Sequence, residues 1–436
     1  MLFRSMVPSA IATLFKTGLL VENRRQDSDS PVLFVLPVVQ SFMQQHGRIG
    51  KDIQQNVQLS CSQYVLDHHK SIPALRVSES ERKALAAEDV NIQAILCSSP
   101  TTQELSDKAI EALISFSWYR CANAKPNLEV AKHAVSMARA FGNKTYIASS
   151  LWCLGDTYGY LGEFYASYDN LQEAYQLYYL YNALQVLPGN RELLRRRCQC
   201  GISMVDAARL VLKECDKVVS FARDVEKQAA TISEDDTHAR SLITLAGILD
   251  EVGNQQEALH HLERAKLMEI GTVASSLYYW IAIVQYHEKR LPEALDAAEE
   301  AWKLSESLVE QAQNSFCLGV ILFSANRDIE AWKFMEISLT KNLELGNRRN
   351  SARTLECMGY GYLRRGDYVN ACGSYEAAAE SYLGTVEEEV GRATCEDNMA
   401  KIKDMQKNPD LSVGFNRPYW DINWPSLYYP GTAASV

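Results

Sequence analysis

Five segments of 14 residues share one pattern, and this pattern constrains the fold more than any other feature of the sequence. Each segment carries Gly or Ala at its second place and closes on a small residue. The residues at the second place are Gly155, Ala246, Ala282, Gly319 and Gly359. The closing residues are Ser167, Ala258, Ala294, Ala331 and Ala371, and the last four of them are 36, 37 and 40 residues apart. A near-constant period in this range predicts a stack of similar units.

The small residues predict paired helices. Two helices approach closely only where one side chain is small, so Gly or Ala is expected at each crossing. A second small residue follows seven places after each closing residue, at Ala174, Ala265, Ala301, Ser338 and Ala378. The turn between the two helices needs a residue that adopts a left-handed conformation. Gly162, Gly253 and Gly366 suit that place, and the other two repeats have Lys289 and Asn326 there.

This pattern resembles the tetratricopeptide repeat family. The last repeat matches best, with Leu355, Gly359, Tyr362, Gly366, Tyr368, Ala371, Tyr375 and Ala378 at the consensus places, although Leu355 stands where the family usually has Trp. The resemblance implies an all-α fold, a right-handed α-solenoid of about seven helical hairpins. A poorer first repeat covers 108–141, and a third unit is predicted as helices over 191–205 and 207–228. The polar segment 386–404 is expected to form a capping helix.

The residues before 108 differ from the repeats. Residues 10–20 and 37–46 are predicted as helices, and between them Leu19–Val21 and Val32–Leu36 are predicted as strands. This order is that of a winged-helix-like remnant, which we place at 1–70. A helical linker follows over 71–107, the repeat array with its cap over 108–407, and a tail rich in aromatic residues and proline over 408–436. Helices are also expected at 57–68, 80–97 and 108–121.

The order of a winged helix followed by repeats resembles the C-terminal half of fungal STAND-class signalling NTPases. The matching stretches are FVLPVVQSFMQQH (34–46), AAEDVNIQAIL (86–96) and ALISFSWYRC (112–121). No G-x-x-x-x-G-K-[ST] loop occurs in the sequence, so the chain resembles the sensor half of such proteins without the nucleotide-binding domain.

Composition excludes several classes of protein. The net charge of -10 argues against a nucleic-acid partner, and the run Arg195–Arg197 is predicted to be the solvated face of a helix. No apolar run is long enough for a membrane span. The 11 cysteines lie mostly in apolar helical segments, which indicates reduced thiols and a cytoplasmic location.

No pattern of residues indicates catalysis. The sequence lacks H-E-x-x-H, G-x-S-x-G and dinucleotide-binding motifs. Asp67-His68-His69 looks like a fragment of a metal site, but the other ligands are missing. We therefore expect a protein that is not an enzyme and uses no cofactor or metal. An enzyme with an unrecognised site remains the weakest alternative.

The expected function is that of a sensor or scaffold that binds a protein or peptide in a concave groove lined by the first helix of each pair. Aromatic residues with a few charges are typical of recognition surfaces. The candidate groove residues are Trp152, Asp156, Tyr160, Tyr279, Tyr286, His287, Phe316, Phe323, Glu356, Tyr360 and Arg364. The family resemblance implies a role in fungal signalling or self-defence. The alternative is a regulatory subunit that acts in trans on a separate P-loop NTPase.

Overall fold

The computed structural model describes residues 20–23, 32–35, 51–69, 79–97, 107–122, 126–184, 191–212, 214–232, 234–268, 273–385 and 388–407. The chain divides into two compact units, Met1–Gln63 and Tyr64–Val436, and each is described by itself. The aromatic tail at 408–436 lies outside the described residues, as do the helices predicted at 10–20 and 37–46.

The first unit contains a β-hairpin. Strand β1 (Leu20–Asn23) pairs antiparallel with β2 (Val32–Val35), and Leu20 lies opposite Val35. The two predicted strands are therefore confirmed. Because the flanking helices fall outside the described residues, the winged-helix remnant stays a prediction. The unit also holds the first part of α3 (Lys51–His68).

The second unit is built from helices. It begins with the end of α3 and continues with α4 (Glu79–Leu96), α5 (Asp107–Ala122), α6 (Leu128–Phe141), α7 (Lys144–Tyr160), α8 (Phe164–Leu184), α9 (Arg191–Val211), α10 (Cys215–Ala229), α11 (Asp235–Glu251), α12 (Gln255–Lys266), α13 (Ala274–His287), α14 (Leu291–Lys303), α15 (Leu308–Ser324), α16 (Asp328–Glu344), α17 (Arg348–Arg364), α18 (Tyr368–Tyr382) and α19 (Glu388–Lys407). Among the described residues, none of these helices is both long and apolar enough to cross a membrane.

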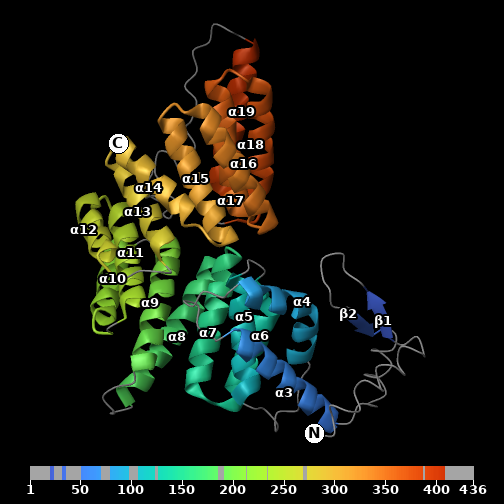
Figure 1. Ribbon diagram of the computed structural model, residues 1–436. Coiled ribbons are helices and arrows are strands. Elements are labelled where there is room, and N and C mark those ends of the chain that lie inside the picture. The colour runs from blue at the N-terminus through green and yellow to red at the C-terminus, as the bar shows by residue number, and fades with distance from the viewer. Residues whose placement is uncertain are drawn as a thin grey trace. The chain divides into compact units, whose positions relative to one another are not determined.

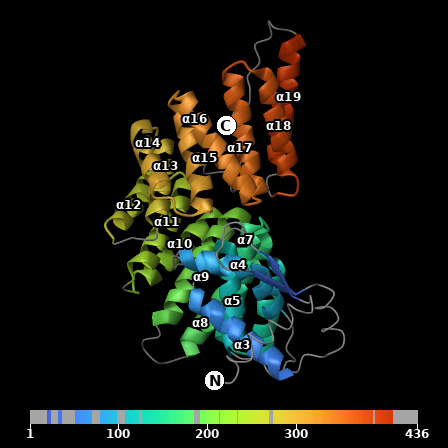
Figure 2. The same cartoon turned by 45° about the vertical axis from the view of Figure 1, so that its right-hand side comes forward.

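Consecutive helices form hairpins that stack in sequence order. Helix pairs in extensive contact are α7 with α8, α11 with α12, α13 with α14, α15 with α16, and α17 with α18, and α8 also packs extensively on α9. Figures 1 and 2 show the colours following one another from α5 to α19 as each hairpin packs on the next. The chain therefore folds as a tetratricopeptide-like α-solenoid.

The predicted small residues lie at the helix crossings. A Cβ atom added to Gly155 would lie 2.6 Å from Leu171 Cγ on α8, and one added to Gly319 would lie 2.7 Å from Met335 Cε on α16. Ala246 and Ala282 are fully buried. At Gly155 the backbone oxygen of Ser167 also lies 3.1 Å from the added Cβ atom, so a larger side chain there would require the helices to move apart. Small residues therefore lie at the helix crossings, as predicted.

The turns between the paired helices are also as predicted. Gly162, Gly253 and Gly366 have φ of 84°, 82° and 72°. Lys289 and Asn326 hold the same conformation with φ of 61° and 59°, although side chains disfavour it. In each of the five regular hairpins, the turn therefore contains one residue in the left-handed conformation, at the same position of the repeat.

The pair α9–α10 departs from the prediction. A break was expected near Asp206, but α9 continues to Val211 and the next helix begins at Cys215. The prediction that Arg195–Arg197 form the solvated face of a helix is also wrong. The side chains of Arg195 and Arg196 are only 14% and 22% exposed, and both pair with Glu192.

Helix α19, the last helix of the described residues, packs on α18. Its inner residues Cys395, Asn398 and Ile402 are fully buried, whereas its first turn carries Glu388 and Glu389. Negative charge at a helix N-terminus interacts favourably with the helix dipole. The helix thus closes the apolar core and presents a polar side to water.

Candidate functional site

The first helices of successive hairpins lie next to one another. Contacts link α7, α9, α11, α13, α15 and α17 in that order. We call the surface that these helices form the first-helix face. Every residue that the sequence nominated for the groove lies on α7, α13, α15 or α17.

Several nominated residues form a ladder between repeats. Each contact of this ladder joins the first helices of two successive hairpins. One residue lies four places after the small crossing residue of its own helix, and its partner lies five places after the crossing residue of the next first helix. Asp250 Oδ2 lies 2.8 Å from His287 Nδ1, and the hydroxyls of Tyr286 and Ser324 lie 2.8 Å apart. Arg364 Nη1 donates to the Phe323 backbone oxygen over 2.7 Å. Tyr286, His287, Phe323 and Arg364 therefore help to hold neighbouring repeats together.

Two other nominated residues are buried within the array. Glu356 is fully buried and accepts a hydrogen bond of 2.7 Å from the hydroxyl of Tyr382 on α18. Trp152 is 3% exposed, packs edge-on against Trp118, and donates from Nε1 to Ser203 Oγ over 3.2 Å. Neither side chain is open to a partner in this conformation.

The remaining nominated aromatic residues are open to solvent to different degrees. Tyr160 is 48% exposed, whereas Tyr279, Phe316 and Tyr360 are half-buried. Tyr279 packs edge-on against Trp280, with ring centroids 5.6 Å apart. Large rings that keep part of their surface accessible are the usual anchors of a protein interface.

Acidic side chains gather on α7, α9 and α11. Asp156 Oδ2 accepts a hydrogen bond from Ser203 Oγ over 3.3 Å, and burial raises the pKa of Asp156 to about 8. Asp206 is nearby, and its charge contributes to that shift. Burial also raises the pKa of Asp206, against the opposing charge of Arg209.

Glu251 on α11 is buried against Arg209 of α9. Its side chain is 2% exposed and its Oε1 lies 3.3 Å from Arg209 Nη1. Burial raises the pKa of Glu251 to about 8, and Arg209 opposes the shift. The guanidinium of Arg209 also stacks over Trp280, 5.4 Å from the ring centre. A Cβ atom at Gly247 would lie 2.9 Å from that ring, so Gly247 makes room for it.

Sequence reasoning missed the residues on α9 and α11, namely Asp206, Arg209 and Glu251. A signal was available for two of them. Glu251 stands five places after Ala246, as His287 does after Ala282, and Asp206 stands five places after Gly201. Gly201 was not recognised as a crossing residue because the third unit lacks the glycine turn.

The two histidines of Asp67-His68-His69, the segment that looks like a fragment of a metal site, have hydrogen-bond partners within the structure. Ser115 Oγ on α5 lies 3.0 Å from His69 Nδ1 and donates to the His69 backbone oxygen over 2.6 Å. His68 Nδ1 lies 2.8 Å from the Tyr64 backbone oxygen. Across the described residues, no three His, Cys, Asp or Glu side chains are placed to hold a metal ion.

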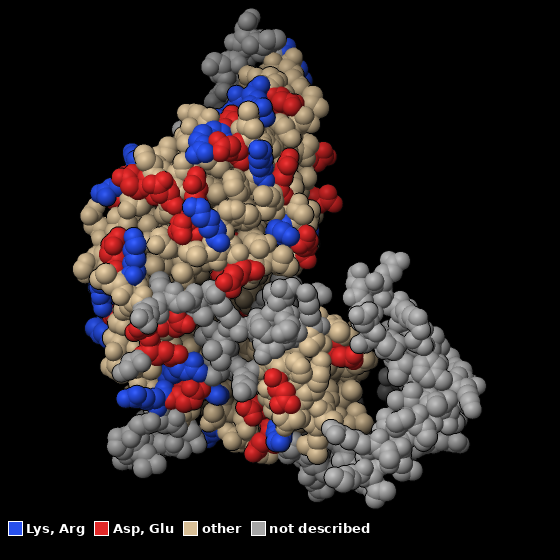
Figure 3. Space-filling view, viewed as in Figure 1, with Lys and Arg blue, Asp and Glu red and all other residues tan. Residues whose placement is uncertain are grey.

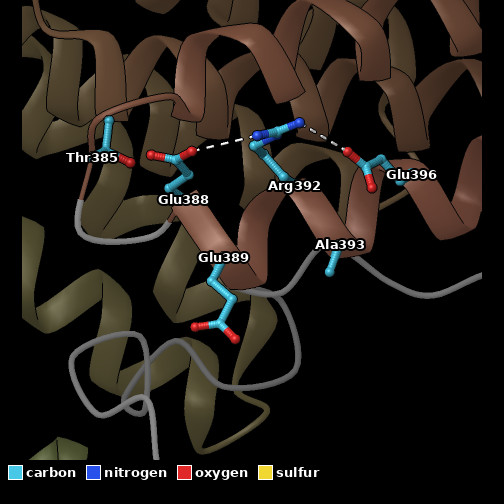
Figure 4. Close-up of a pocket in the computed structure, with 6 residues that line it drawn as sticks. All are labelled: Thr385, Glu388, Glu389, Arg392, Ala393 and Glu396. Atoms are coloured by element: carbon cyan, nitrogen blue, oxygen red, sulfur yellow. Dashed lines mark hydrogen bonds and ion pairs between the residues drawn. The ribbon is translucent and has the colours of Figure 1, made fainter.

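A surface depression at the start of α19 offers no better site. Thr385, Glu388, Glu389, Arg392, Ala393 and Glu396 line it. Arg392 points between two acids, with Nη1 3.4 Å from Glu388 Oε1 and Nη2 3.2 Å from Glu396 Oε1, as Figure 4 shows. In Figure 3, positive and negative side chains are interspersed over the described residues of the visible face. Such mixed, mutually paired charge is ordinary protein surface.

Solved structures with helical repeats resemble this chain. One is the Rap conjugation gene regulator of the plasmid pLS20 in complex with the Phr* peptide, with a TM-score of 0.44 and 12% identity over 83% of this chain and 98% of that chain. The apo quorum sensor NprR from B. thuringiensis has a TM-score of 0.42 and 9% identity over 80% and 99%. Yeast Tom70 has a TM-score of 0.40 and 11% identity over 92% and 80%. A search of protein-family models finds no match, and neither does a search of curated proteins.

Proposed function

We propose that this chain is a non-catalytic protein-binding module that takes a protein or peptide on its first-helix face. The observation that carries the proposal is the set of partly open aromatic residues along that face. Tyr160, Tyr279, Phe316 and Tyr360 keep accessible ring surface on α7, α13, α15 and α17. The ladder fixes the spacing of α13, α15 and α17, which carry three of these residues, so little ordering of those helices remains to be done on binding.

The biological setting is proposed to be signalling or self-defence, with the chain as a sensor or scaffold. The β1–β2 hairpin supports the winged-helix interpretation on which the resemblance to fungal STAND proteins depends. A P-loop NTPase acting in trans is the alternative partner. Purification of the tagged chain from its own cells tests this alternative, which requires a P-loop NTPase to be recovered in stoichiometric amount.

The binding proposal is tested with peptides. A random peptide library is selected against the immobilised full chain, and synthetic copies of the recovered peptides are measured by fluorescence anisotropy. The double variant Tyr160→Ala/Tyr360→Ala is expected to weaken their affinity by roughly tenfold or more, because each ring contributes a hot-spot contact.

The matched control is Tyr165→Ala/Val369→Ala on the second helices α8 and α18, where the two side chains are 72% and 76% exposed. Affinity should be unchanged in this control, and both variants should melt near the wild-type temperature. If no peptide is recovered, or if the first-helix variant binds as tightly as the wild type, the first-helix face is not the binding surface.

A further inference from the structure

Residues 408–436, the tail, differ in composition from the rest of the chain. Their aromatic residues are Phe415, Tyr419, Trp420, Trp424, Tyr428 and Tyr429. Their prolines, which disfavour a continuing helix, are Pro409, Pro418, Pro425 and Pro430. Segments that stay fully in water are normally poor in aromatic residues, because apolar surface is favoured where it is buried. The composition of the tail therefore favours docking on a surface over full exposure to water.

The aromatic residues of the tail recur at a regular interval. A ring is followed by another ring four places later in the pairs Phe415 and Tyr419, Trp420 and Trp424, and Trp424 and Tyr428. The neighbouring prolines favour an extended backbone of the polyproline type. Extended segments of this kind are bound by grooves that aromatic side chains line. The tail thus has the sequence of a ligand for an aromatic-lined face.

The first-helix face has such a lining. Tyr360 on α17, Phe316 on α15 and Tyr279 on α13 are half-buried, and Tyr160 on α7 is 48% exposed. The helices α13, α15 and α17 contact one another in that order, so three of the four rings belong to successive first helices. An extended segment that crosses these helices can therefore meet one accessible ring after another.

The tail starts close enough to reach this face. Helix α19 packs on α18, and α18 packs on α17 (Figure 1). Short connections join the three helices, so neighbours run antiparallel and α19 finishes at the same end of the stack as α17. At a helix spacing of 8 to 10 Å, Lys407 lies on the order of 20 Å from the end of α17. Residues 408–436 would span about 90 Å if extended, whereas the first helices from α17 to α7 span about 50 Å.

Charge favours an approach of the tail to α17. The chain as a whole has a net charge of -10, but α17 is positive. Its charged residues are Arg348, Arg349, Arg353, Arg364 and Glu356. The tail is slightly acidic, with Asp410 and Asp421 against Arg417. Opposite charges attract at short range, so the tail is drawn to α17 more than to the acidic surface elsewhere.

We propose that the tail at 408–436 docks in cis on the first-helix face and competes there with the partner. This inference rests on the proposed function, because it concerns the same face, and it adds an occupant that the chain itself supplies. A tethered segment meets its site at an effective concentration of about 1 mM, so even weak docking occupies the face. A partner binds only the molecules whose tail has left, which lowers its apparent affinity by that fraction.

A photo-crosslink tests the docking without any added peptide. The full chain carries Trp424→p-benzoylphenylalanine, which keeps a ring at that place, and crosslinked tryptic peptides are identified by mass spectrometry after irradiation. Crosslinks are expected within the monomer to α13, α15 or α17. Adding Tyr160→Ala/Tyr360→Ala should lower their yield by about twofold or more, because two ring contacts are lost. The control Tyr165→Ala/Val369→Ala on the second helices should leave the yield unchanged.

The competition is measured with the peptides recovered by the selection described above. In the full chain, Trp420→Ala/Trp424→Ala should raise their affinity by about tenfold in fluorescence anisotropy, because the weakened tail leaves the face more often. The matched control Trp420→Phe/Trp424→Phe keeps both rings and should bind the peptides as the wild type does.

Three results would overturn the inference. Crosslinks that are absent or confined to the second helices would exclude docking on the first-helix face. A crosslinked product of twice the chain mass would assign the tail to a second copy. Equal peptide affinity of the wild type and Trp420→Ala/Trp424→Ala would show that the tail does not compete. Crosslinks to the first helices without recovery of any peptide would instead keep the tail as the ligand of this face and remove the external partner.

Discussion

The regular hairpins and the α9–α10 pair position their helices in different ways. In the regular hairpins, small residues let the two helices of one pair meet closely, as at Gly155 and Gly319. Helix α9 has 21 residues and packs at least as extensively on α8 as on its own partner α10. Its Gly201 faces Val225 of α10 and Tyr175 of α8. Helix α9 is therefore shared between two neighbours.

Charged residues replace the steric pattern where the repeat is irregular. Arg195 Nη1 lies 3.3 Å from Glu234 Oε1, and Arg209 Nη1 lies 3.3 Å from Glu251 Oε1. The guanidinium of Arg197 stacks on the ring of Tyr179, 4.5 Å from its centre. An ion pair or a stacked arginine tolerates more variation in helix spacing than a glycine crossing does. The third unit can thus lose the repeat signature and still connect the repeats on either side.

The largest difference in stability between the two regions should come from a substitution that fills the space at a helix crossing. Gly155→Ala places a Cβ atom 2.6 Å from Leu171 Cγ and 3.1 Å from the backbone oxygen of Ser167, which cannot rotate away. Gly201→Ala meets only side-chain atoms, the nearest 2.9 Å away. We expect Gly155→Ala to destabilise the chain by about 2 to 3 kcal/mol and Gly201→Ala by about 1 kcal/mol. Thermal melting ranks the two variants.

The control for this comparison is Gly373→Ala on α18, where a Cβ atom would have no neighbour within 4 Å. It should stabilise the chain by up to about 1 kcal/mol, because alanine is the better helix former. If Gly201→Ala proved as costly as Gly155→Ala, α9 would be held by the same steric rule as the regular helices.

A smaller effect is expected from Glu251→Gln, which tests the buried contact between Glu251 and Arg209 in the irregular region. The pKa of Glu251 rises from 4.5 in its ordinary state to about 8 in the folded chain. Between these two pH values the folded state holds a proton that the unfolded state has lost, so wild-type stability falls as the pH rises. Glutamine does not titrate, so the stability of the variant does not fall with pH for this reason. Relative to the wild type, the free energy of unfolding of the variant should rise by about 1 to 2 kcal/mol between pH 5 and pH 8.

Melting temperatures of wild type and variant across this pH range give the comparison, with the exposed Glu263→Gln on α12 as the control. The control should follow the wild type at every pH. Should Glu251→Gln instead lose stability relative to the wild type as the pH rises, Glu251 would be an ionised partner of Arg209 and burial would not dominate.

The difference between the regular hairpins and the α9–α10 pair also explains how much of the fold could be predicted from the sequence. The crossings at Gly155, Gly319 and Gly359 and the turn at Lys289 follow from sterics within one hairpin, and local sequence is enough to find them. The end of α9 was misplaced because no glycine or proline marks it.

The candidate site was harder to predict than the fold. The ladder from Asp250 to His287 depends on how far one repeat is shifted against the next, and no sequence within a single hairpin encodes that shift. Glu356 was assigned to the face by periodicity, but its hydrogen bond to Tyr382 keeps it in the core. Its burial depends on a residue 26 places further along the chain.

The smallest effects concern the two regular hairpins that turn without glycine. Lys289 has φ of 61° and Asn326 has φ of 59°. Glycine removes the strain of about 1 kcal/mol or more that lysine bears in this conformation, but it also raises the entropy of the unfolded chain. Lys289→Gly should therefore gain about 0.5 kcal/mol, whereas Asn326→Gly should change little, because asparagine tolerates the left-handed region.

The reverse substitution provides the control in a matching turn. Gly253→Ala, at φ of 82°, should lose about 1 kcal/mol, since it introduces the strain that Lys289→Gly removes. Differential scanning calorimetry of the three variants measures the order. Equal responses at Lys289 and Asn326 would mean that the turns are fixed by the packing of the helices on either side and not by the conformational preference of the turn residue itself.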